Sequence, residues 1–315
     1  MRMLIYGAGG MGLYLSARLA QAGHSVTLKA RGETLQRGGG AGGAPLSLVT
    51  DEGEEQVGDV EIVGELGQAS GRFDVAVIAT KAWQVDEAAE EIAPVLTADA
   101  RVITTQNGVD APGQAAEHLH PEQVLAGAVV VIAQRTASTT VRLTGSEASM
   151  ILGSLQHPQA AERDQEILSA FVRAGVLTQW NEDILTALWK KLALVASYGA
   201  VGALSGAPVG INRAVPQTKA LVRNAMQEAL TVGNARGASL QEQDLEDIMS
   251  TFTHRFSEST TASMQRDLLE GRPSELREQV GAIVSHAREC GVDVPIYETV
   301  YASQLPRELM ARRQN

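Results

Sequence analysis

The sequence predicts an α/β protein of two domains, a doubly wound parallel sheet followed by an all-helical C-terminal domain. Three observations predict this architecture. Residues 1 to about 180 alternate short apolar runs with helix-like segments, and the later residues show helical spacing with no strand-like run. The helix-cap signal Asn181-Glu182-Asp183 separates the two patterns. We therefore place the domains at residues 1–180 and 181–315.

The first strand, expected over residues 4–6, leads into a glycine-rich turn and then a helix over residues 13–22. Gly7, Gly9 and Gly12 fit G-x-G-x-x-G. They allow a tight turn, close backbone approach to a pyrophosphate, and close packing of helix on strand, while the helix N-terminus offers N–H groups to phosphates. The strand–turn–helix–strand context predicts a Rossmann-type dinucleotide site. The turn is completed by Ala8, Gly10 and Met11.

The second strand, expected over residues 24–30, indicates which dinucleotide binds. An NAD site usually has Asp or Glu near the end of this strand, where it holds the ribose 2′-OH. Lys29 and Arg31 stand there instead. Two cations suit a 2′-phosphate, so NADP(H) is favoured over NAD(H). The alternative is that both are ordinary solvated charges.

The remaining elements follow in order. In the N-terminal half we expect a hairpin of residues 46–50 and 57–63, strands at 73–80, 101–105, 125–133, 141–143, 149–153 and 176–180, and helices at 82–96 and 167–174. In the C-terminal half we expect helices at 184–196, 222–236, 242–256 and 275–291. The glycine-rich run at residues 37–45 follows no strand and opens no clear helix, so we expect a flexible loop without an assigned role.

Composition limits the function classes. The 315 residues carry a net charge of −11, which argues against a general nucleic-acid or anionic-membrane binder. The single cysteine, Cys290, excludes an internal disulfide. We see no room for a signal peptide and no apolar run of membrane-span length, so we expect a cytoplasmic protein. His118 and His120 lack a third ligand at metal-binding spacing, and we expect no metal site.

Four further motifs make the prediction specific. They are Thr-Lys-Ala-Trp-Gln at 80–84, Gln-Asn-Gly-Val at 106–109, Leu-Trp-Lys-Lys-Leu-Ala at 188–193, and Ser-Met-Gln-Arg-Asp followed by Gly-Arg-Pro-Ser-Glu at 263–275. Together with the glycine turn, and in this order, they closely resemble the ketopantoate reductase (2-dehydropantoate 2-reductase) family over almost the whole chain.

That family reduces a 2-keto acid to a 2-hydroxy acid with NADPH. The resemblance implies that Lys81 lies beside the cofactor, that Asn107 lies between cofactor and substrate, and that Lys191 is the general acid. It also implies that Ser263 binds the substrate and that Glu275 binds a ligand or positions other groups at the site. Elementary chemistry supports the lysine role, since an ammonium can stabilise the oxyanion formed by hydride delivery and then protonate it.

Each of these residues also has an ordinary interpretation. Lys81 and Lys191 could be solvated charges, Asn107-Gly108 a simple turn, and Glu275 a helix-start acid. We interpret Lys190 as a helix-surface charge, and Trp83 and Trp189 as packing residues.

The chain departs from the family pattern beside the general acid. The family usually carries asparagines where this chain has Val195 and Gly199, and Arg277 and Gln279 replace an acid and an asparagine after Glu275. Residues 191, 195 and 199 share one helix face. We therefore expect a smaller, more apolar substrate wall at Val195 and Gly199, with extra space at the glycine.

The expected function is NADPH-dependent reduction of a small anionic 2-keto acid. The substrate is ketopantoate, giving pantoate for pantothenate and coenzyme A biosynthesis, or a related keto acid. One alternative is a sister NADP-dependent dehydrogenase with another substrate, and a second is a non-catalytic NADPH-sensing protein. A homodimer stays open as the assembly, and we expect no nucleic-acid or membrane partner.

Overall fold

A computed structural model describes residues 1–38, 44–145 and 148–314. The chain divides into two compact units. Unit 1 comprises Met1–Gln106 and Ala111–Ile184, and unit 2 comprises Asn107–Asp110 and Leu185–Asn315. The sequence placed its boundary a few residues earlier, at 180/181, and assigned residues 107–110 to the first domain. The glycine-rich run falls largely at residues 39–43, which lie outside the described residues.

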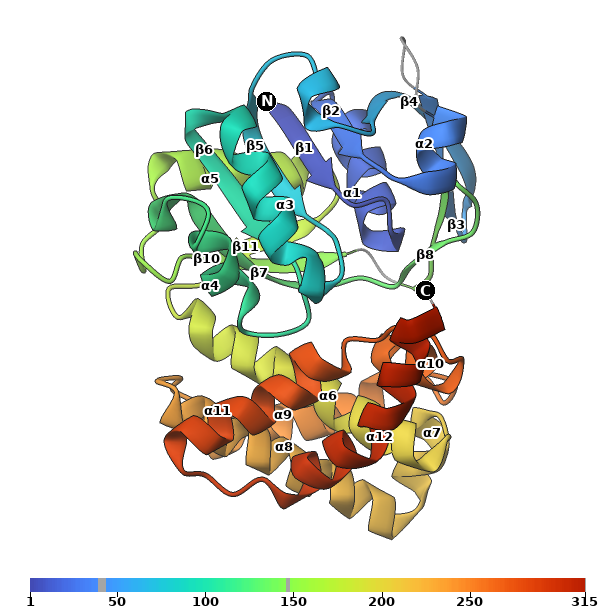
Figure 1. Ribbon diagram of the computed structural model, residues 1–315, viewed down its shortest axis with the longest axis vertical. Coiled ribbons are helices and arrows are strands. Elements are labelled where there is room, and N and C mark those ends of the chain that lie inside the picture. The colour runs from blue at the N-terminus through green and yellow to red at the C-terminus, as the bar shows by residue number, and fades with distance from the viewer. Residues whose placement is uncertain (39–43, 146–147, 315) are drawn as a thin grey trace. The chain divides into compact units, whose positions relative to one another are not determined.

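Unit 1 contains one mixed sheet (Figure 1). Among the described residues its strands follow the order β11-β10-β7-β6-β5-β1-β2-β4-β3-β9-β8. Within the run β7-β6-β5-β1-β2-β4 each adjacent pair of strands is parallel, whereas β10 pairs with β7 and β3 pairs with β4 in the antiparallel sense. The bounds are β1 Arg2–Tyr6, β2 Ser25–Lys29, β3 Ala44–Thr50, β4 Gly53–Val63, β5 Phe73–Ile78, β6 Leu96–Thr104, β7 Val124–Val130, β8 Ala133–Arg135, β9 Thr140–Leu143, β10 Ser149–Gly153 and β11 Leu177–Trp180.

Helices cover both faces of this sheet. They are α1 Gly10–Gln21, α2 Gly32–Gly38, α3 Val85–Ile92, α4 Ala111–Ala116 and α5 Glu162–Arg173, with 3-10 turns η1 Leu66–Gln68, η2 Ala82–Gln84, η3 Ala93–Val95 and η4 Pro121–Gln123. Alternate residues of β1 enter different cores. Met3 and Ile5 pack with α1 and α5, whereas Leu4 and Tyr6 pack with α3 and α4. A strand buried on both faces explains the unbroken apolar run in the sequence, and the predicted doubly wound sheet is confirmed.

Unit 2 is helical among its described residues. Its elements are α6 Ile184–Ser205, α7 Val209–Ala214, α8 Pro216–Ala235, α9 Glu242–Ser250, α10 Ser263–Leu269, α11 Ala282–Cys290 and α12 Pro295–Gln314, with π turns η5 Thr251–Arg255 and η6 Arg277–Gly281. In the described part of the chain, α6 is the one helix long and apolar enough to cross a membrane, contrary to our expectation from the sequence. However, 56% of its apolar window is buried inside the protein, as in the core helix of a folded domain.

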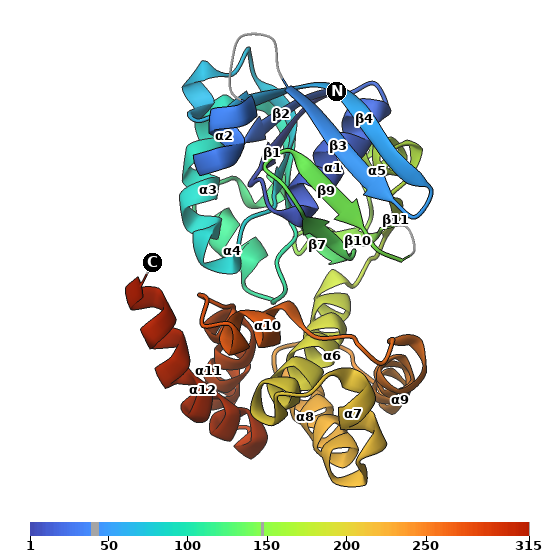
Figure 2. The same cartoon turned by 90° about the vertical axis from the view of Figure 1, so that its right-hand side faces the viewer.

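The structure corrects several element predictions. The hairpin is confirmed, because β3 and β4 pair antiparallel, and β3 also pairs with β9 beside it (Figure 2). The expected strand at 125–133 is two strands, β7 and β8. Helices α7, α10 and α12 lacked a clear amphipathic signal, and α12 also contains Pro306 in its interior. Proline removes a backbone donor from a helix, so α12 lacks one backbone hydrogen bond at Pro306.

Candidate active site

The glycine turn joins β1 to α1 at the carboxyl edge of the sheet. Gly7 has φ +117°, and a Cβ there would lie 2.9 Å from the Ala79 carbonyl oxygen. A Cβ on Gly12 would overlap the Gly7 carbonyl, so glycine lets α1 pack onto the strand as predicted. At Gly9 nothing lies within 4 Å of the Cβ position, and at Gly10 the Ala133 carbonyl closes the turn from the β8 side. The turn thus has one open face, at Gly9, where a ligand can approach the backbone.

Polar side chains at the ends of β5 and β6 complete this edge. Gln106 is buried and its Nε2 donates to the carbonyls of Ile78 at 2.9 Å and Thr80 at 3.1 Å. The Thr80 Oγ1 is buried without a hydrogen-bond partner in the described part of the chain, and its methyl group lies next to Gly7. Lys81 follows, with its Nζ 5.9 Å from the centre of the Trp83 ring. An open glycine cradle beside an unsatisfied hydroxyl fits a dinucleotide.

The two cations at the end of β2 have different environments. Lys29 is 3% exposed; its Nζ donates to the Gly64 carbonyl and forms an ion pair with Glu91 at 3.1 Å. Burial acts to raise the pKa of Glu91, but Lys29 together with the neighbouring Tyr6 and Arg31 outweighs it and the pKa is lowered. Arg31 is exposed and pairs with Glu87 at 2.5 Å. The ammonium of Lys29 is therefore buried and paired within the protein. Arg31, in contrast, is exposed, so a ligand at this end of the sheet can contact it.

In unit 2, α6 carries Lys191 with a buried ammonium. Its Nζ has no hydrogen-bond partner among the described residues. Burial lowers the pKa of Lys191 to about 8, and the negative charge of Glu275 opposes that shift. A lysine with a pKa near the working pH can donate its proton to a developing oxyanion.

The adjacent Lys190 has the surface role that the sequence predicted. Its Nζ donates to Asp244 at 2.7 Å and to Asp247 at 2.8 Å, both on α9. Partial burial acts to lower the pKa of Lys190, but the two carboxylates outweigh it and the pKa is raised. Neighbouring positions of α6 thus hold a lysine paired with two carboxylates and a buried lysine whose ammonium has no hydrogen-bond partner among the described residues.

The turn before η6 holds Glu275, which is buried and accepts a hydrogen bond from Gln279 at 3.2 Å. The preceding Ser274 is fixed by the fully buried Glu308 of α12, which accepts from its backbone N–H at 3.0 Å and its hydroxyl at 2.6 Å. Arg312 donates to the other oxygen of Glu308 at 2.5 Å. Gln279, one of the departures from the family pattern, therefore contacts the carboxylate that acts on Lys191, whereas Arg277 is exposed.

One expectation about the substrate wall is wrong. A Cβ on Gly199 would lie 3.0 Å from the Cβ of Ala262 and 3.2 Å from the Cε of Met264. Gly199 is thus where α6 packs against the start of α10, and it leaves no extra space. Val195 is half-buried, as is Ser263 at the first position of α10. The apolar substrate wall expected at Val195 stays a prediction, whereas the extra space expected at Gly199 is absent.

The Asn107–Asp110 segment belongs to unit 2 by its contacts. A Cβ on Gly108 would lie 3.1 Å from the Glu278 carbonyl oxygen of η6. Asp110 contacts the His286 ring of α11 at 2.8 Å. Asn107 therefore leaves the end of the sheet within a segment that packs beside the helices following Glu275.

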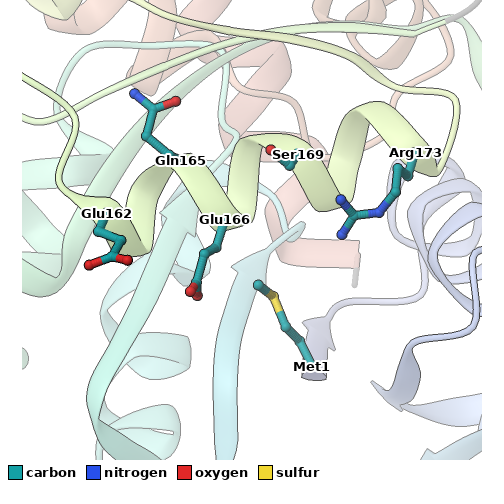
Figure 3. Close-up of a pocket in the computed structure, with 6 residues that line it drawn as sticks. All are labelled: Met1, Glu162, Gln165, Glu166, Ser169 and Arg173. Atoms are coloured by element: carbon teal, nitrogen blue, oxygen red, sulfur yellow. The ribbon is translucent and has the colours of Figure 1, made fainter.

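The pocket drawn in Figure 3 lies elsewhere. It has a volume of about 510 Å³ and is lined by Met1, Glu162, Gln165, Glu166, Ser169 and Arg173, mostly along α5. No residue that the sequence assigned to the site lines it, so we do not assign the activity there. Across residues 1–38, 44–145 and 148–314, no group of three or more His, Cys, Asp or Glu is arranged to hold a metal ion.

The sequence did not indicate several residues that shape the site. Glu87 and Glu91 are partners of Arg31 and Lys29, and Glu308 fixes the turn at Ser274. The i, i+4 spacing of Glu87 and Glu91 places them on one helix face, but nothing in the sequence says that this face meets the end of β2. Glu308 lies in α12, a helix that the sequence did not predict.

Comparisons with known proteins agree with this architecture. Residues 3–157 match the model of the ketopantoate reductase PanE/ApbA domain, and residues 183–304 match its C-terminal domain. A 2-dehydropantoate 2-reductase of Mesorhizobium japonicum is 28% identical, with 99% of each chain covered.

Solved structures share the fold over the whole chain. A PanE/ApbA family ketopantoate reductase from Ralstonia eutropha superposes with a TM-score of 0.86 at 26% identity, covering 99% of this chain and 100% of that one. A D-mandelate dehydrogenase solved with NADH and anilino(oxo)acetate superposes with a TM-score of 0.86 at 18% identity, covering 99% of each chain, and shows the fold alone. The two domain matches together span most of the sequence, and the chain belongs to the ketopantoate reductase family.

Proposed function

We propose that this protein uses NADPH to reduce a 2-keto acid to the corresponding 2-hydroxy acid. The observation that carries the proposal is the buried ammonium of Lys191, which has no hydrogen-bond partner in the described part of the chain and feels the negative charge of Glu275. The chemistry that a bound nicotinamide supplies is delivery of a hydride to the keto carbon. Lys191 then stabilises the negative charge on the oxygen and gives it a proton, and Glu275 raises the pKa of Lys191 so that it stays protonated near neutral pH.

The cofactor is expected to lie along the carboxyl edge of unit 1. The open face at Gly9, with the N-terminus of α1, suits the pyrophosphate, because α1 has no acidic residue in its first turn to repel it. Arg31 is suited to a 2′-phosphate, since it is exposed and always charged. Lys29, predicted from the sequence for the same role, is instead expected to support the strand end.

The residues proposed to contact the substrate argue for a substrate other than ketopantoate. A hydroxyl placed against Val195 would lack the amide partner that the family usually presents, at a cost of about 1–3 kcal/mol. We therefore expect a 2-keto acid with an apolar side chain to be the better substrate. The D-mandelate dehydrogenase structure, solved with anilino(oxo)acetate, is an example of this fold with an aryl-bearing ligand.

The test is NADPH oxidation, followed by absorbance, with a panel of 2-keto acids that includes ketopantoate and branched apolar analogues. Lys191→Ala is expected to lower the turnover rate by roughly 100-fold or more while NADPH binding persists, the usual scale for loss of a general acid. Lys190→Ala is the matched control, because its ion pairs are with Asp244 and Asp247. Equal rates in the two variants would contradict the assignment. NADPH binding without turnover of any keto acid would favour the sensing alternative.

A further inference from the structure

The exposed ion pair between Arg31 and Glu87 lies where the adenosine end of the cofactor is expected. Arg31 follows β2, and Glu87 lies in the first turn of α3, 56 residues later in the chain. The two charged groups are 2.5 Å apart, with side chains 55% and 50% exposed. Arg31, the accessible cation at this strand end among the described residues, is thus already paired with a carboxylate of the same unit.

The surrounding charges do not favour an anion. Glu91 lies one turn after Glu87 on α3 and pairs with Lys29, and Glu65 lies 4.0 Å from the same ammonium. Among these five groups the carboxylates outnumber the cations. A 2′-phosphate carries nearly two negative charges, so at Arg31 it shares the guanidinium with Glu87 and is repelled by that carboxylate.

We propose that Glu87 is the residue that sets how strongly this enzyme prefers NADPH over NADH. This inference rests on the proposed function, because it takes the β2 end as the site of the adenosine ribose. Glu87 competes with the 2′-phosphate for the guanidinium of Arg31, and so weakens NADPH binding. Glu87 does not weaken NADH binding in the same way. The ribose hydroxyls of NADH are neutral and can donate hydrogen bonds to a carboxylate.

The size of the effect follows from exposure. An ion pair that is half open to solvent on both sides is weak, so a phosphate can replace it. Glu87 therefore reduces the preference without abolishing it. The preference for NADPH then depends on the balance between the phosphate contact and the Glu87 contact at the guanidinium of Arg31. It is smaller than the preference expected if Lys29 and Arg31 both bound the phosphate without a competing carboxylate.

The experiment is a fluorescence titration of NADPH and NADH against the wild type, Glu87→Gln and Arg31→Ala. Glu87→Gln is expected to tighten NADPH binding about two- to fivefold, the range for loss of an exposed ion pair, while NADH binding does not tighten. Arg31→Ala is expected to weaken NADPH binding about tenfold or more and leave NADH nearly unchanged. In the double variant Glu87→Gln with Arg31→Ala, the gain from the glutamine should disappear, because the two residues act through one contact.

Glu90→Gln is the matched control. Glu90 is exposed on the same helix and its substitution removes the same charge, so a general effect of net charge would appear equally in both variants. Titrating 2′,5′-ADP against 5′-AMP locates the change at the 2′-phosphate without the nicotinamide. If Glu87→Gln and Glu90→Gln leave the same NADPH-to-NADH ratio as the wild type, the inference is overturned and the proposed function survives. If the wild type binds neither cofactor, the proposed function fails as well.

Discussion

Lys190 and Lys191 are neighbours in one helix, yet their pKa values shift in opposite directions. Two aspartates of α9 stabilise the charged form of Lys190, whereas burial without a hydrogen-bond partner among the described residues disfavours the charged form of Lys191. The same residue type is thus structural at one position and chemically suited to proton donation at the next. The side chain's surroundings decide its role, and Glu275 is the charged residue that adjusts it.

This arrangement predicts the pH profile. In the proposed mechanism reduction requires protonated Lys191, so kcat/KM should be level below about pH 8 and fall above it. Glu275→Gln removes the charge that raises this pKa, so the falling limb should move to lower pH. The measurement is kcat/KM between about pH 6 and pH 10. Glu298→Gln, on the exposed side of α12, is the control. A limb that stays in place or moves to higher pH in Glu275→Gln would contradict the role given to this carboxylate.

At the scale of elements, local signals predicted what depends on local structure. The glycine turn, the β3–β4 hairpin and the core helix α6 each have spacing or turn residues that indicate them. The predictions fail where the local structure depends on contacts with a distant part of the chain. The sequence predicted extra space at Gly199 because it indicated only which residues share its helix face. In the structure, Ala262 and Met264 occupy that space. Likewise α12, with Pro306 inside it, is a helix that tertiary packing stabilises.

The packing at Gly199 changes how the substrate wall should be tested. Val195→Asn is expected to move the preference about tenfold toward ketopantoate, because it restores an amide to the half-buried position beside Lys191. Gly199→Asn is expected to lower the free energy of unfolding by about 1–3 kcal/mol, since its Cβ meets Ala262 at 3.0 Å. Steady-state kinetics on ketopantoate and a branched apolar 2-keto acid, together with thermal unfolding, check both. A Gly199→Asn variant as stable as the wild type would show that α10 moves aside easily.

At the scale of the whole molecule, the sequence predicted an α/β domain followed by a helical domain. It did not predict that the chain enters the second unit early, at residues 107–110. Residues 107–110 follow β6 directly, so sequence order placed them in the first domain, although their contacts are with η6 and α11. The Arg31–Glu87 and Ser274–Glu308 contacts also join positions far apart in the chain. Pairings of this kind depend on the assembled fold and leave no periodic signal in one sequence.

The two units also have separate stabilising contacts, and this predicts how the protein unfolds when one contact is lost. Glu308 is fully buried, and three donors from Ser274 and Arg312 converge on it. Glu308→Ala should lower the stability of unit 2 by roughly 3 kcal/mol, at the lower end for a broken buried pair because Arg312 stays partly exposed. Unit 1 has its own cores around β1 and does not use this contact. Thermal unfolding should therefore change from one transition toward two, with NADPH raising the transition of unit 1. Glu298→Ala on the same helix removes only an exposed ion pair with Arg288 and should change the curve little. A single transition shifted as a whole in Glu308→Ala would show that the two units unfold together.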